Sequence, residues 1–240
     1  MVSAIIVAAG VSRRMGFDKL FAPLSGKPVL WHSLKAFQET KAVDEILVVT
    51  REEAMDDVEK LVAQGGLGKV TKVISGGAER HISVWNGLQA VDSRGSEFIA
   101  IHDGARPLVT PALIEACLNL AQTHGAASCA SQIPDTVKRA SIEQMVTESV
   151  ERTGLWAMQT PQVFSSGLIL QAYAALMAKH EMVTDEVSAV QKLGKKIALL
   201  KNDDWNLKIT FPHDLELAEH VLDLRAKKNA KSAKPRTISR

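Results

Sequence analysis

Short apolar runs alternate with amphipathic stretches along the first half of this 240-residue chain, and this alternation constrains the fold more than any other feature. Because the runs are continuously apolar, they match strands that are covered on both faces of a sheet. The strand–helix–strand order predicts an α/β fold with a parallel sheet between two layers of helices. The predicted strands are residues 3–8, 45–50, 70–74, 98–102 and 126–133, and the predicted helices lie near 29–38, 53–64, 80–91 and 111–124.

The pattern changes after Pro134. Residues 135–160 mix β-branched residues with charges, so we expect an excursion from the sheet, in the form of a two-stranded arm, instead of a fifth strand–helix unit. Regular patterns then return, and Pro212 fits the first turn of a last helix. The expected elements are helices at 165–179 and 185–193, a short strand at 196–200 and a final helix that ends near residue 227.

The chain ends in a strongly basic segment. Residues 225–240 hold seven basic side chains and no acidic ones, so the formal charge of +2 for the whole chain becomes −5 for the rest. Such a segment is expected to be disordered, which leaves one folded domain over residues 1–224. The mildly acidic body lacks the basic footprint of nucleic-acid-binding proteins, so we expect no nucleic-acid partner.

Compartment and membrane signals are also weak. No apolar run reaches the roughly 18 residues that a membrane span needs, and the first residues lack the basic and apolar regions of a signal peptide. Cys117 and Cys129 both lie in apolar segments, which favours two reduced thiols in the core. We therefore expect no membrane partner and a cytoplasmic location.

The segment at residues 8–19, AAGVSRRMGFDK, follows the first predicted strand directly. Ligands bind at the carboxyl ends of strands in open parallel sheets, and small residues there let backbone N–H groups reach phosphate oxygens. Arg13, Arg14 and Lys19 add cations where a triphosphate needs them. The spacing matches neither the P-loop nor the dinucleotide fingerprint. The segment predicts a nucleotide site, although a glycine turn with solvated basic residues also fits.

A second segment, IAIHDGARP, covers residues 99–107. Asp103 ends a buried strand, which is a position suited to a Mg²⁺ ligand, and Arg106 is suited to a second phosphate. His102 fits a structural role better than a catalytic one. A strand-end turn with a surface ion pair is the alternative interpretation of this segment.

A third segment places a Gly76-Gly77 turn before a helix, with Ser83 about one turn into it. Backbone groups and the Ser83 hydroxyl suit recognition of a base, although Gly-Gly turns are common. The polar segments after residue 134 indicate no role from their chemistry alone. Thr184, for example, fits the N-cap of a helix that starts with the acidic residues Asp185 and Glu186.

Together these segments resemble the family of 2-C-methyl-D-erythritol 4-phosphate cytidylyltransferases of the non-mevalonate isoprenoid pathway. The resemblance implies a Rossmann-like, doubly wound, mostly parallel sheet with an extended β-arm that builds a homodimer. It also implies that CMP passes from CTP to the small acceptor methylerythritol phosphate, with Mg²⁺, giving the CDP-linked product and pyrophosphate. The matching pieces run in the family's order from residue 8 to residue 210: AAGVSRRMG with a following lysine, GGAER, HDGARP, PDTVKR, ERTGLW, TPQVF, TDE and LKIT.

The same resemblance implies roles for single residues. Asp103 matches a carboxylate near metal and ribose and is the candidate Mg²⁺ ligand, and Thr136 and Arg152 would come from the partner subunit's arm. The implied catalytic residues are Arg14, Lys19, Arg152 and Lys208. The implied nucleotide-binding residues are Ala8, Ala9, Gly10, Gly77, Arg80, Ser83 and Asp103. The implied acceptor-binding residues are Asp103, Arg106, Thr136, Arg152, Thr160, Thr184 and Lys208.

The chain departs from the family's pattern without losing a charged catalytic position. Ser12 replaces a second glycine, the stretch before Lys19 is short, with Asp18 where a proline is usual, Ala78 replaces an aspartate beside the base, and Gly104 replaces an alanine. Three other functions stay open from the sequence. They are a ribitol 5-phosphate cytidylyltransferase, a non-catalytic nucleotide-binding protein and an RNA-binding protein that uses the basic tail.

Overall fold

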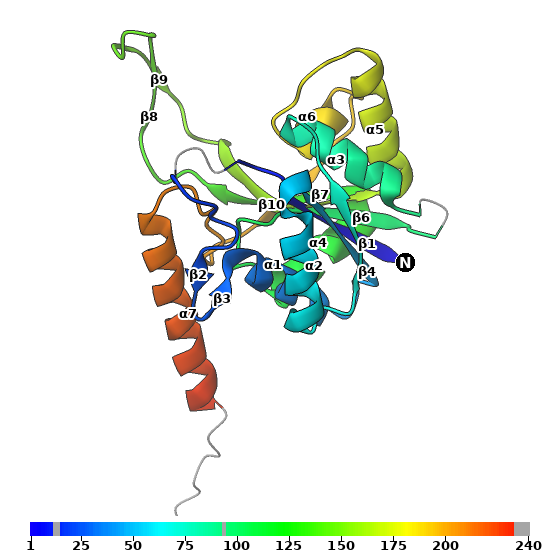
Figure 1. The fold of residues 1–240 in the computed structure, drawn as a ribbon. Helices are drawn as coiled ribbons and strands as arrows, with labels where there is room; N and C mark the ends of the chain where they lie inside the picture. The colour runs from blue at the N-terminus through cyan, green and yellow to red at the C-terminus, as the bar shows by residue number, and fades with distance from the viewer. Residues whose placement is uncertain (12–14, 93–94, 233–240) are drawn as a thin grey trace, which may run out of the picture.

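A seven-stranded sheet forms the centre of the protein in the computed structural model, which describes residues 1–11, 15–92 and 95–232 (Figure 1). Its strand order is β11-β7-β10-β6-β1-β4-β5. Neighbouring strands are parallel except at β10, which is antiparallel to both β6 and β7. The predicted mostly parallel sheet is therefore confirmed. The strands are β1 Val2–Ala8, β4 Glu45–Thr50, β5 Val70–Ser75, β6 Phe98–Asp103, β7 Ala126–Gln132, β10 Trp156–Ser165 and β11 Ala198–Lys201.

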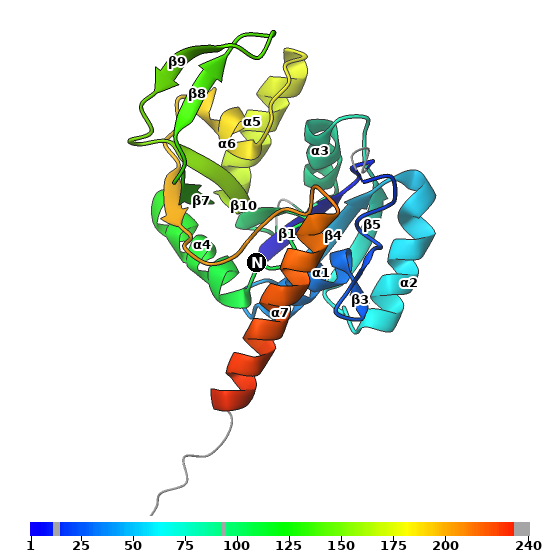
Figure 2. The same ribbon diagram turned by 90° about the vertical axis from the view of Figure 1, so that its left-hand side faces the viewer.

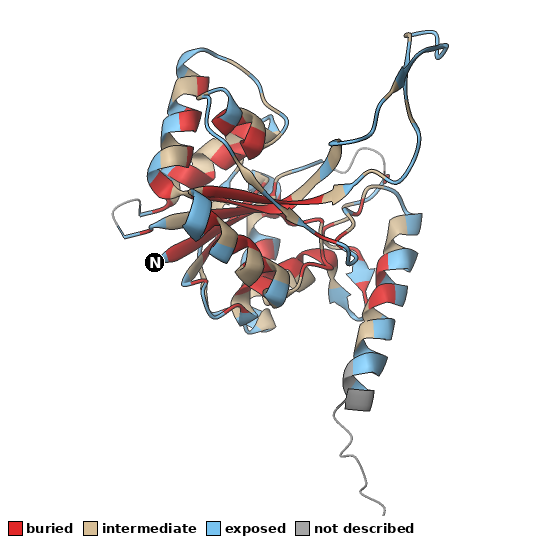
Figure 3. Ribbon diagram, turned by 180° about the vertical axis from the view of Figure 1, so that it is seen from behind, coloured by how far each residue is buried: buried red, intermediate tan, exposed pale blue. Residues whose placement is uncertain are grey.

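Helices cover both faces of this sheet, as the continuously apolar strands predict. Successive side chains of β1 point to opposite faces, so Ile6 packs in one core with α1, α2 and α4, whereas Ile5 packs in the other with α3, α5 and α6. The strands between the two layers are largely buried (Figure 3). The helices are α1 Val29–Glu39, α2 Met55–Gly65 with the short η1 Glu52–Ala54 before it, α3 Arg80–Ala90, α4 Pro111–His124, α5 Ser166–Ala178 and α6 Glu186–Gln191.

Strand β10 is a difference from the sequence prediction. Residues 156–160 were expected in the arm, but they begin a ten-residue strand of the central sheet. The pairing of β10 with β7 shifts register between Met158 and Gln162, around Pro161. Proline is tolerated inside a sheet mainly at such irregularities. Because the proline and polar residues interrupt its apolar pattern, this strand cannot be recognised as an apolar run in the sequence.

The arm itself is a separate two-stranded sheet, β8 Val137–Ala140 and β9 Val146–Val150, paired antiparallel. It extends away from the body of the molecule (Figure 1) and is almost fully exposed (Figure 3). Its large apolar side chains Ile142, Met145 and Val146 are exposed by 94%, 68% and 67%. The predicted two-stranded arm is present, over a shorter range than expected.

The last helix, α7 His213–Ser232, packs through Ala218 and Val221 against Leu24 of the small hairpin β2 Pro23–Leu24 and β3 Lys27–Pro28 (Figure 2). It continues past residue 227, so the disorder expected from residue 225 is wrong for residues 225–232. Arg225 is held by the carbonyls of Leu108 and Trp205 and by the Asp204 carboxylate. Residues 233–240 of the basic tail lie outside the described residues. None of the described helices is both long enough and apolar enough to span a membrane.

Candidate active site

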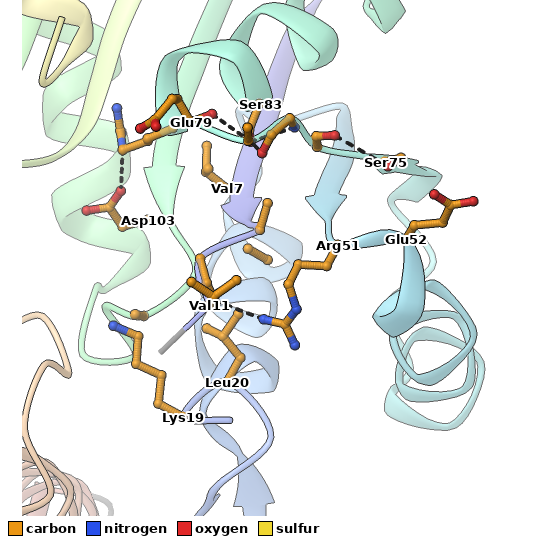
Figure 4. A pocket seen from close by; sticks show the side chains of 18 of the residues that line it. Val7, Val11, Lys19, Leu20, Arg51, Glu52, Ser75, Glu79, Ser83 and Asp103 are labelled. Atoms are coloured by element: carbon orange, nitrogen blue, oxygen red, sulfur yellow. Dashed lines mark hydrogen bonds and ion pairs between the residues drawn. The ribbon is translucent and has the colours of Figure 1, made fainter. Parts of the chain in front are cut away.

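The carboxyl ends of β1, β4, β5 and β6 meet at one edge of the sheet, where a cavity of about 630 Å³ opens (Figure 4). β4 and β5 lie on one side of β1 and β6 lies on the other, so the cavity sits where the strand order reverses. Open α/β sheets bind ligands at this point. The cavity wall includes every residue expected to bind the nucleotide, together with two of the expected catalytic lysines: Ala8, Ala9, Gly10, Gly77, Arg80, Ser83, Asp103, Lys19 and Lys208.

The glycine turn before α3 forms the upper wall of this cavity in Figure 4. The Ser83 hydroxyl accepts a hydrogen bond from Gly77 N at 3.0 Å and donates to Glu79 O at 3.1 Å. A Cβ atom on Gly76 would lie 2.6 Å from the Cβ of Ala9. The turn therefore needs glycine because it packs closely against the end of β1, and Ser83 fixes the shape of the turn.

A second cavity, of about 870 Å³, shares Arg80, Asp103 and Lys208 with the first. Its wall holds three residues expected to bind the acceptor, Arg106, Thr160 and Thr184. Ligands bound in the two cavities would therefore meet beside the shared residues. Because two of those residues are cations, the meeting point is suited to two anionic ligands.

Asp103 is the centre of the shared wall. Its Oδ1 lies 3.1 Å from Arg80 Nε, and its Oδ2 lies 2.9 Å from Lys208 Nζ and 3.5 Å from Arg106 Nε. Burial alone would raise the pKa of this carboxyl group, but Arg80, Lys208 and Arg106 together hold it far below its usual range. Asp103 is therefore an anion that gathers three cations between the two cavities.

Glu186 completes this network, although its only local signal in the sequence is a place in the first turn of a helix. Its carboxylate is fully buried and accepts two hydrogen bonds from the Arg80 guanidinium, at 2.6 and 3.1 Å, and one from Tyr173 Oη at 3.1 Å. Burial would lower the pKa of Arg80, but Glu186 and Asp103 raise it above its usual value. Arg80 is thus fixed between two carboxylates with its charge retained.

His102 has the structural role that the sequence favoured. Its ring is fully buried, which lowers its pKa to about 3. Nδ1 lies 3.0 Å from Thr160 Oγ1 and Nε2 lies 3.3 Å from Arg106 O. Thr160 Oγ1 also accepts a hydrogen bond from Asp103 N at 3.0 Å. The neutral imidazole therefore ties β6 to the bulge of β10 and does not act as an acid or base at neutral pH.

The predicted cations differ in their placement. Lys19 Nζ donates to Ile209 O at 2.8 Å, next to Lys208 in the chain, whereas Arg14 lies outside the described residues. Arg106 donates to Asn206 O and Met158 O, and its Nε has no hydrogen-bond partner among the described residues. Burial lowers the pKa of Arg106.

The structure does not bring every predicted site residue together in one chain. Thr136 and Arg152 are exposed at the base of the arm, outside both cavities, and Arg152 donates to Pro134 O. Asp185, and not Thr184, caps α6 by accepting from Ser188 N, so the helix begins one residue later than expected. Thr184, just before this cap, is exposed on the second cavity.

A metal site cannot be built from the described side chains alone, because they contain no group of three or more histidine, cysteine or carboxylate residues suited to one. Asp103 offers a single carboxylate at the shared wall. Mg²⁺ commonly uses one or two carboxylates together with substrate phosphates, so the residues fit a metal ion that arrives with a triphosphate.

A doubly wound sheet with two joined, cation-lined cavities at its switch point defines the class of an α/β nucleotidyltransferase. Comparison with known proteins gives the family: the chain belongs to the 2-C-methyl-D-erythritol 4-phosphate cytidylyltransferases, whose sequence model matches residues 2–224.

Individual relatives match this chain over nearly its whole length. The Bacillus mycoides (strain KBAB4) protein of that name is 40% identical over 230 residues, which cover 95% of this chain and all of that protein. A relative from Caldanaerobacter subterraneus subsp. tengcongensis is 41% identical over 92% of this chain and 98% of its own. The crystal structure of 4-diphosphocytidyl-2C-methyl-D-erythritol synthase from Anaerococcus prevotii superposes with a TM-score of 0.80 at 28% identity, covering 93% of this chain and 98% of that one.

Proposed function

We propose that this protein transfers CMP from CTP to 2-C-methyl-D-erythritol 4-phosphate and releases pyrophosphate. The family assignment supports the two substrates. The observation that carries the proposal is the pair of cavities with Arg80, Asp103 and Lys208 in common. Two polyanions that react with each other need this arrangement of separate sites with a shared cationic wall. Release of pyrophosphate from CTP with 2-C-methyl-D-erythritol 4-phosphate, compared with release when ribitol 5-phosphate is the acceptor, tests the proposal.

The chemistry needs no protein nucleophile. A phosphate oxygen of the acceptor attacks the α-phosphorus of CTP, the bond from that phosphorus to the bridging oxygen breaks, and pyrophosphate leaves with the electron pair. Catalysis then rests on positioning and on neutralising charge. Each cation placed on the developing charge contributes roughly 3–4 kcal/mol, by comparison with measured losses at oxyanion-stabilising sites.

The two cavities suggest how the residues divide this work. Lys19, which lines the first cavity, and Arg14, whose role the family resemblance implies, bind the triphosphate and stabilise charge on the α-phosphorus. The small residues at the end of β1 and the turn at Gly77 hold the nucleotide, with Arg80 oriented by Glu186. The acceptor phosphate and hydroxyls bind the residues of the second cavity: Asp103, Arg106, Thr160, Thr184 and Lys208.

Mg²⁺ is part of the proposal. Asp103 would hold it together with the CTP phosphates, and the ion would neutralise charge on the phosphate oxygens. We also propose a cytoplasmic location, which fits a CTP-dependent biosynthetic enzyme.

We further propose a homodimer in which the arm of one chain completes the acceptor site of the other. Exposed Ile142, Met145 and Val146 give the arm an apolar surface of the kind that marks contacts. Thr136 and Arg152 lie at its base, outside both cavities of their own chain. The partner subunit's Arg152 would then add a cation to the acceptor phosphate.

Mixed dimers test this arrangement. Lys19→Ala and Arg152→Ala chains should each be nearly inactive alone, because each lacks a cation at every site. In a mixed dimer one site would receive both native residues and the other neither, so random mixing should restore about a quarter of wild-type turnover. A mixture no more active than its two components would contradict a site shared between subunits.

A further inference from the structure

Arg51 contacts both ends of the segment at residues 8–19, called the glycine loop below. It follows β4 directly and lines the first cavity. Its Nη1 donates to Gly10 O at 2.9 Å, and its Nη2 lies 2.5 Å from Asp18 Oδ2. One guanidinium group thus contacts the chain just after β1 and again immediately before Lys19. In Figure 4 it points toward the end of β1 from the side of the cavity opposite Asp103.

Asp18 connects Arg51 to the backbone next to Lys19. While its Oδ2 pairs with Arg51, its Oδ1 accepts a hydrogen bond from Leu20 N at 3.0 Å. Lys19 lies between these two residues and extends to Ile209 O. Asp18 is therefore held at both carboxylate oxygens, next to a residue that lines the first cavity.

The surroundings of Arg51 favour a positioning role over direct ligand binding. The side chains of Arg51 and Asp18 are only 17% and 27% exposed. Burial would lower the pKa of Arg51, but Asp18 and Glu53 raise it above its usual value. All three guanidinium nitrogens have a protein acceptor, since Nε lies 3.0 Å from Glu53 Oε1. Partly buried, charge-assisted hydrogen bonds of this kind hold geometry better than exposed ion pairs do.

We propose that Arg51 is a positioning residue for CTP: by linking Gly10 to Asp18 it sets the separation of the two loop ends and places Lys19 against the triphosphate. The inference rests on the proposed function, because it assumes that the first cavity binds CTP. It concerns only the described ends of the loop.

Arg51→Met tests the inference, because methionine keeps an unbranched side chain without the charge. The Kd for CTP, measured by calorimetry, and the KM for CTP should both rise about tenfold, the effect of losing one or two charge-assisted hydrogen bonds. The KM for the acceptor should change little.

Asp18→Asn, which keeps the shape of Asp18, should raise the Kd and the KM for CTP to a similar extent. The double variant should be no worse than either single one, because both remove the same link. Arg51→Lys should recover part of the affinity.

Lys60→Met is the control, since it removes a positive charge from an exposed ion pair with Asp57 on α2, and it should leave the CTP affinity unchanged. Wild-type CTP affinity in folded Arg51→Met, or fully additive effects of the two single changes, would overturn the positioning role while leaving the proposed function intact. A wild-type protein that fails to bind CTP would instead overturn the proposed function, and this inference with it.

Discussion

Lys19→Ala should lower kcat by about a hundredfold or more, which matches the loss seen when a single oxyanion-stabilising donor is removed. Lys19 lines the first cavity and is fixed through Ile209 O, and under the proposed function its ammonium group neutralises the negative charge that grows on the triphosphate. Because this interaction strengthens in the transition state, the loss should fall on kcat more than on the KM for CTP. Steady-state kinetics with both substrates varied measure it.

Lys208→Ala is the matched comparison, because it removes the same charge from the wall that the two cavities share. It should raise the KM for the acceptor and keep the affinity for CTP. Near-normal turnover of Lys19→Ala, or loss of CTP binding in Lys208→Ala, would contradict the division of roles between the two lysines.

Glu186→Ala should destabilise the protein by about 3–5 kcal/mol, the cost of removing one partner of a buried ion pair. The change leaves Asp103 as the only carboxylate paired with Arg80, and Asp103 also pairs with Lys208 and Arg106. It also leaves Tyr173 Oη without its acceptor. Urea unfolding at one fixed protein concentration measures the loss.

Glu186→Gln serves as the control because it keeps the volume of the side chain and part of its hydrogen bonding. It should be less destabilised than Glu186→Ala. Both variants should bind CTP more weakly, since Arg80 loses its orientation. A loss of stability below about 1 kcal/mol for Glu186→Ala, the range of a surface ion pair, would show that this network does not support the site.

Most of the sheet follows from local sequence patterns. The buried strands β1, β4 and β6 are continuous apolar runs. Helix α4 has Thr110 as its N-cap and a proline in its first turn, and its C-cap is Gly125, whose φ is 79°. Strand β10 could not be found in the same way, because its pairing depends on distant strands and its register shifts around Pro161.

The candidate site, like the fold, can be predicted from the sequence only where its signals are local. The strand-end motifs that hold Gly10, Lys19 and Asp103 are local, so the sequence points to them and the fold brings them to one edge. The contacts that orient these residues are not local. Glu186 lies 106 residues from Arg80 and Arg51 lies 33 residues from Asp18, and only the folded chain brings each pair within hydrogen-bonding distance.

The most direct test of the account is pyrophosphate release by the purified full-length protein with CTP, ATP, GTP and UTP, each offered with 2-C-methyl-D-erythritol 4-phosphate or ribitol 5-phosphate. We predict Mg²⁺-dependent release with CTP and the erythritol acceptor, and little with any other pair. Ala78 lies on the wall of the first cavity, next to the Gly76-Gly77 turn for which the sequence predicts contact with the base, so the comparison with UTP is the most informative among the nucleotides. Turnover with ribitol 5-phosphate in preference to the erythritol acceptor, or CTP binding without turnover, would contradict the account.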